Sequence, residues 1–368
     1  MATEQVLHIH MKGGEGETSY STNSLVQKKV ILKVKPILEE SIKRMLSSTT
    51  FESGLNVADL GCSTGPNALL VVYNIIKIID STNQNLSRDP FEVKFYLNDL
   101  FGNDFNSIFK SLPDFYQRID QEEVKDKVFI NATPGNFYGR LFPNNYIHLF
   151  HSSYSLHWLS QAPKSLTKRS EPLNKGNICL TPTSPLIVYR AYFEQFQKDF
   201  KLFLKSRAEE LMLGGTMIVT MMGRENTHDI GNPSMVISMV LNDMALEGLI
   251  DEVTLDFFDL PLYSPTTEEV RQVIDEERSF TLQTLNTSKI GWDGNIQDDV
   301  DDCVFDRNMR GEFMAKSIRA VLEPLLETVF GKDIMDELFS RFAKKVAQLL
   351  EYETLELTNL VVCMRKNP

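Results

Sequence analysis

The sequence has no long hydrophobic run, and this absence bears on where the protein resides. No uninterrupted apolar stretch reaches about 18 residues, the length that spans a bilayer as a helix. The opening residues, MATEQVLHIHMKGG, show no apolar segment behind a basic one and do not resemble a secretory signal. We therefore expect a soluble, cytoplasmic protein with no membrane partner.

Positive charge is also in deficit. The chain has 38 lysines and arginines against 50 aspartates and glutamates, which gives a formal net charge of -12. This balance would repel a polyanion rather than attract it. We expect no nucleic-acid partner.

Metal-binding patterns are missing as well. The four cysteines, Cys62, Cys179, Cys303 and Cys363, are widely separated, and no C-x-x-C pair occurs. This spacing is typical of neither a zinc site nor a disulfide framework, so we expect reduced thiols in the core or in loops. The acidic segment 293–306 lacks the glycine and glutamate positions of an EF-hand, and a solvated loop is expected there.

The most informative segment is LNVADLGCSTGPN, residues 55–67. Its apolar beginning predicts a strand, Gly61 and Gly65 predict a tight turn, and Pro66 suits the first turn of a helix. Apolar residues then follow at helical spacing: Leu69, Val72, Ile76 and Ile79. This order is typical of a nucleotide-cofactor site, although such glycines also serve close strand–helix packing alone.

The spacing of the glycines indicates which cofactor the segment would hold. G-x-x-x-G replaces the G-x-G-x-x-G of dinucleotide sites, and no phosphate-loop Gly-Lys-Ser/Thr follows, so a diphosphate is not favoured. Asp59 lies where a carboxylate can pair with a cationic amine, which suits S-adenosylmethionine. Asp99 closes a second predicted strand, Phe91 to Asp99, where it can accept both ribose hydroxyls. The two acids together favour an adenosyl cofactor.

The middle of the chain predicts an α/β protein. Strands are predicted over 127–131, 146–151 and 216–222, and a long helix over 191–213 is expected to end at Gly214-Gly215. Strands and helices that alternate in this way form a doubly wound sheet.

The last third of the chain is predicted to be mainly helical. Ser264-Pro265 is expected to cap one helix, Pro324 to interrupt another, and 334–349 to form a third. Two strand-like segments, 279–288 and 357–364, are expected to complete the sheet as an antiparallel pair. The helices between these strands would form a lid.

Five blocks of sequence are similar to one known family. They are MKGGEGETSYSTNSLVQ at 11–27, DLGCSTGPN at 59–67, LNDLFGNDFN at 97–106, PGNFYGRLFP at 134–143 and HSSYSLHWLSQAP at 151–163. With these blocks in this order, the chain resembles the plant SABATH methyltransferases, which methylate small carboxylic acids or xanthine nitrogens with S-adenosylmethionine. The resemblance implies a Rossmann-like class I methyltransferase sheet with an α-helical cap, commonly as a homodimer. It implies no catalytic metal, although Mg is possible in some relatives.

Approximate domain boundaries follow from the pattern and the resemblance together. The cofactor-binding core is expected over 1–152 and 186–232, with strands near 279–290 and 355–368. The mainly helical substrate cap is expected over 153–185, 233–278 and 291–354.

The resemblance also implies site residues, position by position. The expected cofactor contacts are Lys12, Ser24, Asp59, Asn67, Asp99, Leu100 and Phe137, with Asn136 where the family usually has serine. The expected substrate-orienting donors are Gln27 and Trp158. Residues expected to line the substrate pocket are Tyr20, Tyr154, His157, Tyr263, Ile318 and Val321. Outside these motifs, a lone Trp158 would be interpreted as a core indole and Gln27 as a surface amide.

Three further positions bear on the substrate and the chemistry. His157 stands where salicylate-selective relatives carry methionine, which makes the chain look more like benzoate, jasmonate or xanthine methylating relatives. Met235 and Met239 follow a 223–233 loop that looks shorter than in the family, and they fit either an adaptable pocket or ordinary core. His151 is expected to be a structural histidine rather than a base.

A carboxylate acceptor is the favoured interpretation. A small acid with a pKa of roughly 4 is already ionised at pH 7, so direct displacement at the sulfonium methyl needs no general base. Gln27 and Trp158 offer two N–H donors, which suit the two oxygens of a carboxylate. We expect methyl-ester formation from a benzoate/salicylate- or jasmonate-like acid, with xanthine N-methylation as the alternative. The two donors argue against a non-catalytic adenosyl-binding protein.

Overall fold

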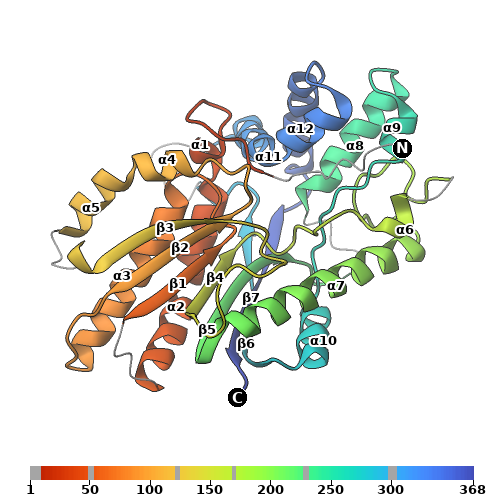
Figure 1. Cartoon of the computed structure of the whole chain (residues 1–368). Coiled ribbons are helices and arrows are strands. Elements are labelled where there is room, and N and C mark those ends of the chain that lie inside the picture. Colours follow the sequence, from red (N-terminus) through yellow and green to blue (C-terminus); the bar gives the residue numbers. More distant parts are fainter. Residues whose placement is uncertain (1–9, 49–53, 121–124, 168–170, 227–231, 297–304) are drawn as a thin grey trace.

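A computed structural model describes residues 10–48, 54–120, 125–167, 171–226, 232–296 and 305–368 (Figure 1). A seven-stranded mixed sheet runs through its centre, with the strand order β3-β2-β1-β4-β5-β7-β6. The strands are β1 (Leu55–Leu60), β2 (Val93–Asp99), β3 (Val128–Pro134), β4 (Ile147–Ser153), β5 (Leu211–Gly223), β6 (Phe280–Gly291) and β7 (Glu356–Lys366).

The first five strands are parallel, and β7 runs antiparallel to both of its neighbours, β5 and β6. The α/β class and the antiparallel pair at the end of the chain are therefore confirmed. Parallel strands are covered on both faces, which explains why β1 and β4 are nearly fully buried.

Helices cover both faces of the sheet. On one face, α2 (Leu25–Ser48) and α3 (Pro66–Asn85) bury a cluster that includes Val72 and Ile76 against Val57 of β1. On the other face, α7 (Leu186–Glu210) packs a row of phenylalanines into a cluster with β4 and β5, and α10 (Thr267–Glu277) adds aliphatic side chains to it. Two hydrophobic layers thus hold the sheet, and they leave the carboxyl ends of its parallel strands as the place for a ligand.

A third cluster belongs to the cap. It joins α8 (Pro233–Leu246), α9 (Glu252–Asp256), α11 (Arg307–Phe330) and α12 (Met335–Leu349), which lie beyond the carboxyl ends of the parallel strands (Figure 1). The shorter elements are α1 (Tyr20–Asn23), α4 (Phe105–Lys110), α5 (Leu112–Asp120), the 3-10 turn η1 (Lys125–Lys127) and α6 (Lys164–Thr167). None of the described helices combines the length and apolarity needed to cross a bilayer.

The predicted end of α7 is wrong. The helix ends at Glu210, and Gly214 and Gly215 lie inside β5 rather than behind the helix. Leu211 is fully buried, has an extended backbone and pairs with Ile147 of β4. Sheet pairing therefore begins where the helical pattern predicts three more residues of helix.

Two predictions about helix ends are also corrected. Pro324 does not interrupt α11, which continues to Phe330 around buried Leu322 and Leu325. The cap of α10 is Thr266 rather than Ser264-Pro265, because Thr266 and Glu269 form a reciprocal capping box.

The acidic segment 293–306 is not solvated where it begins. Asp293 is buried, and its Oδ2 accepts a hydrogen bond from Arg310 Nε at 2.6 Å. Residues 297–304 of this segment lie outside the described residues. Cys62, Cys179 and Cys363 are buried free thiols as predicted, whereas Cys303 lies outside the described residues.

Candidate active site

The glycine turn after β1 is built for close approach. The backbone N–H groups of Gly61 and Cys62 both donate to Asn98 O at 2.9 Å, which ties the end of β1 to β2. Gly61 has φ +73°, and a Cβ there would lie 2.1 Å from Ser155 Oγ. Gly65 has φ +90°, and a Cβ there would collide with Ser21. Only glycine fits both positions, so the turn stays bare for a ligand.

Asp99 ends β2 beside this turn. Its Oδ2 accepts a hydrogen bond from Ser63 N at 2.7 Å, and its Oδ1 accepts one from Leu100 N at 2.8 Å. Burial is the largest influence on this carboxyl, and it raises the pKa to about 6 although both backbone donors oppose the rise. Each oxygen keeps a lone pair for a further donor, such as a ribose hydroxyl.

These groups border a cavity of the described structure that has a volume of about 320 Å³. The sequence-predicted residues that line it are Tyr20, Gln27, Asp99, Leu100, Asn136, Phe137, Tyr154, His157, Trp158, Ile318 and Val321. They come from α1, α2, α11 and the ends of β2, β3 and β4. The fold therefore brings most of the predicted site together from distant parts of the sequence.

Four predicted cofactor residues do not line the cavity but hold the segments that do. Asp59 is buried and pairs through Oδ1 with His151 Nδ1 at 2.7 Å, so His151 has the structural place predicted for it. Asn67 Nδ2 donates to Ser24 Oγ at 3.0 Å, which joins α3 to the start of α2. Lys12 forms an ion pair with Glu323 of α11 and accepts from Tyr20 N through its carbonyl at 2.8 Å.

Three other predicted positions lie apart from the cavity. Tyr263 is buried in a polar network, where its hydroxyl accepts from Arg224 Nη2 at 2.8 Å and donates to Glu269 Oε1 at 2.9 Å. Met235 belongs to the core of the cap, and Met239 is 43% exposed. The methionines that line the cavity are Met11, Met222 and Met314.

The substrate end of the cavity contains His157, a histidine that stays neutral. Burial lowers the pKa of His157 to about 3. Its Nδ1 accepts a hydrogen bond from Met222 N at 3.2 Å, so the ring proton lies on Nε2. Tyr154 packs edge-on against the ring, with the centroids 5.5 Å apart, and donates its hydroxyl proton to Asn359 Oδ1. The histidine is therefore a wall of the pocket and cannot serve as a base near pH 7.

Residues 6–367 match the model of one protein family, the SAM-dependent carboxyl methyltransferases. The chain belongs to this family. The SABATH resemblance, the class I methyltransferase fold and S-adenosylmethionine as the methyl donor are thereby confirmed. Within the described residues, no cluster of three or more histidine, cysteine or acidic side chains could hold a metal ion.

Curated relatives span almost the whole carboxyl methyltransferase chain. A probable jasmonic acid carboxyl methyltransferase of Theobroma cacao is 42% identical over 367 residues, which cover 97% of this chain and 98% of the relative. Salicylate carboxymethyltransferase of Clarkia breweri is 41% identical over 369 residues, with 99% of each covered. A probable caffeine synthase of Coffea canephora is 40% identical over 375 residues, which cover 98% of this chain and 97% of the relative.

A solved structure shares the fold. Loganic acid methyltransferase with SAH superposes on this carboxyl methyltransferase with a TM-score of 0.83 at 33% sequence identity. The match covers 97% of this chain and 99% of that structure.

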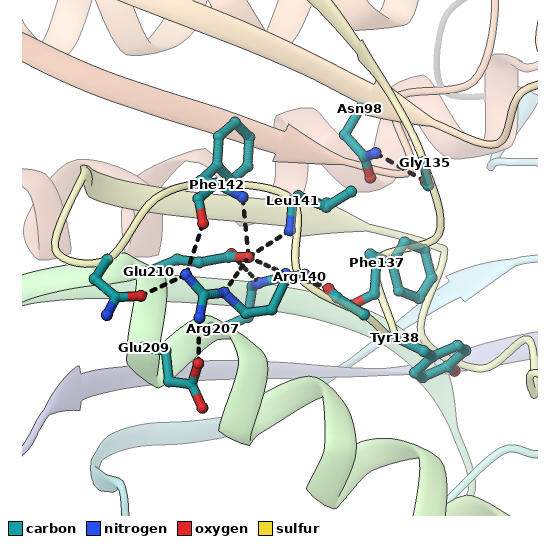
Figure 2. Close-up of polar contacts among 12 residues, drawn as sticks. Asn98, Gly135, Phe137, Tyr138, Arg140, Leu141, Phe142, Arg207, Glu209 and Glu210 are labelled. Carbon is teal, nitrogen blue, oxygen red and sulfur yellow. Dashed lines mark hydrogen bonds and ion pairs between the residues drawn. The ribbon is translucent and has the colours of Figure 1, made fainter.

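The loop 135–142 of this methyltransferase carries Asn136 and Phe137, and a buried ion pair holds it in place (Figure 2). Arg207 donates from Nη1 to Phe137 O and from Nη2 to Gly139 O, both at 2.7 Å. Its Nε donates to Glu210 Oε2 at 2.8 Å. Both charged side chains are fully buried.

Glu210, the partner of Arg207 in this ion pair, also holds the loop 135–142. Its Oε1 accepts from the backbone N–H groups of Leu141 at 2.5 Å and Phe142 at 3.1 Å. Sequence analysis missed both residues, since opposite charges three positions apart on a helix usually form a solvated pair. The only local signal is the phenylalanine-rich helix around them, which predicts burial of one face but not of a charge.

We expect His157→Met to change which acid is preferred and to keep substantial turnover. The neutral ring shapes the pocket beside Trp158. Methionine in its place changes the contacts that one side chain makes with the acid, which should alter the kcat/KM ratio of two acids roughly tenfold or more. The measurement is kcat/KM for a set of aromatic and aliphatic acids in both enzymes. The pH–rate profile between pH 6 and 8 should be unchanged, because a group with a pKa of about 3 does not titrate there. Near-total loss toward every acid in a folded, cofactor-binding variant would contradict this role.

Proposed function

We propose that this carboxyl methyltransferase forms methyl esters of a small carboxylic acid of the benzoate/salicylate or jasmonate type. One observation carries the proposal: the cavity that borders Asp99 also places Gln27 and Trp158, two neutral donors, beside the apolar side chains of Ile318 and Val321. An ionised acid is its own nucleophile at pH 7, so a site without a base suits it. A phenol or an alcohol would need one.

The cofactor end of the cavity suits S-adenosylmethionine. Gly61 lines the cavity without a side chain, and the lone pairs of Asp99 that its backbone donors leave free can accept hydrogen bonds from ribose hydroxyls. When bound there, the cofactor supplies a methyl group on a cationic sulfur as the electrophile. The residues named here bind, orient and exclude water, and no proton has to move.

At the substrate end of the cavity, the protein contributes to the reaction by aligning the substrate with the methyl donor. Trp158 is held by its backbone, since its carbonyl accepts from Tyr138 Oη at 2.6 Å and its N–H donates to Ser155 O at 3.1 Å. Its side chain lines the cavity, where the indole N–H can donate to a substrate oxygen. Fixing the acceptor against the donor can contribute about 7–11 kcal/mol in well-oriented systems.

Xanthine N-methylation is the second candidate, because one relative is named as a probable caffeine synthase. The two candidate substrates differ in how they can accept hydrogen bonds from Gln27 and Trp158. A carboxylate has an oxygen for Gln27 and another for Trp158, whereas a xanthine that is methylated at N3 or N7 presents a single carbonyl near the reacting nitrogen. The carboxylate therefore satisfies the donors more completely.

We expect ester formation to dominate when acids and xanthines compete, and Trp158→Phe to lower kcat/KM for the acid about tenfold. Phenylalanine keeps much of the aromatic surface but deletes one donor to a charged oxygen. The assay supplies labelled S-adenosylmethionine with benzoate, salicylate, jasmonate and xanthines at equal concentration and separates the products chromatographically. Methylxanthines without any ester product would replace the proposal by its alternative.

The homodimer and the cytoplasmic location also belong to this proposal. The family resemblance supports the dimer, and sedimentation of the purified chain across a range of concentrations tests it. A fluorescent fusion followed in plant cells tests the location. The division into core and cap likewise stays a prediction; α10, which lies within the predicted cap range 233–278, packs with α7 and β6 in the described structure.

A further inference from the structure

The cavity has a second tryptophan in its wall. Trp292 follows β6 and is 2% exposed, and its Nε1 is buried without a hydrogen-bond partner among the described residues. Buried N–H groups in folded proteins are nearly always paired, so such a group indicates a partner that arrives in another state of the molecule.

Gln27 carries the complementary atom. Its Oε1 is also buried without a partner among the described residues, and its side chain lines the same cavity. One more unpaired buried oxygen occurs on the described part of this wall, Ser63 Oγ, but it belongs to the glycine turn beside Asp99. Gln27 is thus the unpaired acceptor at the substrate end.

The loop that carries Trp292 packs on the turn of α2 that carries Gln27. A Cβ added at Gly294 would lie 3.5 Å from Val26 Cα and 3.6 Å from Lys29 Cγ. Trp292 and Val26 also belong to one buried cluster. The two unpaired atoms therefore come from neighbouring segments.

The two side chains differ in how firmly their positions are fixed. Trp292 N donates to Leu355 O at 2.9 Å, and Gly291 N donates to Asn295 Oδ1 at 2.7 Å. Asp293 anchors the same loop to α11 through Arg310. Gln27 has a long side chain with several torsions, so the fixed indole can set the orientation of the amide.

We propose that Trp292 is a positioning residue, whose Nε1–H donates to Gln27 Oε1 when the acceptor acid is bound. This bond turns Gln27 Nε2, the donor, toward the carboxylate. An amide turned the other way would present its oxygen to the carboxylate oxygens and repel them. Gln27 Oε1 and Trp292 Nε1 are both buried, so a hydrogen bond between them satisfies two unpaired groups at once. The identity of the acid rests on the proposed function.

A double-mutant cycle tests this coupling. Trp292→Phe should lower kcat/KM for the esterified acid about threefold to tenfold, the effect of one lost hydrogen bond. In a Gln27→Met enzyme the same change should cost less than about twofold, because the bond is already absent. Met314→Leu is the matched control: it alters the same cavity wall without removing a donor, and its effect should be equal in both backgrounds. An equal Trp292→Phe loss in both backgrounds overturns the proposal.

A second measurement needs no turnover. The chain has two tryptophans, so ¹⁵N-indole labelling gives two Nε1–H signals, which Trp292→Phe assigns. With S-adenosylhomocysteine and benzoate added, the Trp292 proton should shift downfield in the wild type and not in Gln27→Met. A shift that survives Gln27→Met, or no shift at all, overturns the proposal. A panel of acids that yields no ester instead overturns the proposed function, so the two failures are distinguishable.

Discussion

Replacing Arg207 by methionine should lower the free energy of unfolding by about 3–5 kcal/mol, the cost of breaking one side of a buried ion pair. Glu210 would keep its charge in a fully buried place, where the backbone donors of Leu141 and Phe142 remain. The remaining cation is Arg140, which is 39% exposed and whose Nε lies 3.4 Å from Glu210 Oε1. The carbonyls of Phe137 and Gly139 would also lose their donors. Urea unfolding of the two enzymes, compared at equal m-values, measures the difference.

Lys201→Met provides the matched control on the same helix. Lys201 pairs with Glu276 at 2.6 Å, but both side chains are about two-fifths exposed, at 41% and 42%. Loss of such a solvated pair should cost at most about 1 kcal/mol. If Arg207→Met proves as mild as Lys201→Met, the buried pair does not support the loop in the way described.

The double variant Arg207→Met with Glu210→Leu separates charge from packing. Removing both partners leaves no uncompensated charge, so much of the lost stability should return. The affinity for S-adenosylmethionine should not return with it, because the loop that carries Asn136 and Phe137 still lacks its hydrogen bonds. Calorimetric titration of the double variant distinguishes the two effects.

The glycine turn and Asp99 could be predicted because the signal is local. Gly61 and Gly65 adopt positive φ, which glycine does at no steric cost, and a strand with an acid at its end fixes where that acid lies. The antiparallel pair β6 and β7 could be predicted because its segments are rich in β-branched and apolar residues. In these cases the residue types and their order along the chain carry the information.

Tertiary contacts decided the features that the sequence analysis missed. Leu211 continues a helical pattern, yet it joins β5 because it pairs with Ile147 of β4. Pro324 removes one N–H donor, but buried neighbours in the cap hold the helix together around it. Neither outcome follows from the local sequence, since each depends on which distant segment packs against the residue.

The polar partners inside the site were the hardest to predict. Asp59 was expected to face the cofactor amine, and the structure shows its Oδ1 engaged by His151 from β4. Arg207 and Trp292 occur in no sequence motif used here. A buried charge and a buried indole N–H acquire their roles only when the fold has closed around them, so the residue type alone cannot indicate the role.

Asp99→Ala should weaken binding of S-adenosylmethionine about 10- to 150-fold, or about 1.5–3 kcal/mol, the worth of hydrogen bonds to a charged group. The carboxylate lines the cavity beside the bare glycine turn, and its two backbone donors hold it in one orientation for the ribose hydroxyls. Calorimetric titration at pH 7.5 measures the change. Unchanged affinity in a folded variant would remove Asp99 from the cofactor site.

The pH dependence of cofactor binding and of stability gives an independent test of the role of Asp99. The pKa of Asp99 in the folded chain is raised to about 6. The affinity for the cofactor should therefore rise as the pH rises through 6, because the Asp99 carboxyl becomes ionised over that range. A carboxyl whose folded pKa is raised contributes stability that is fully present below its ordinary pKa and lost as the pH rises through about 6. At pH 7.5 the ionised Asp99 therefore destabilises the cofactor-free chain. Asp99→Asn should then bind the cofactor weakly with no titration near pH 6, while its cofactor-free form unfolds at an equal or higher urea concentration than the wild type. A lower unfolding midpoint together with weak binding would instead point to general damage of the fold.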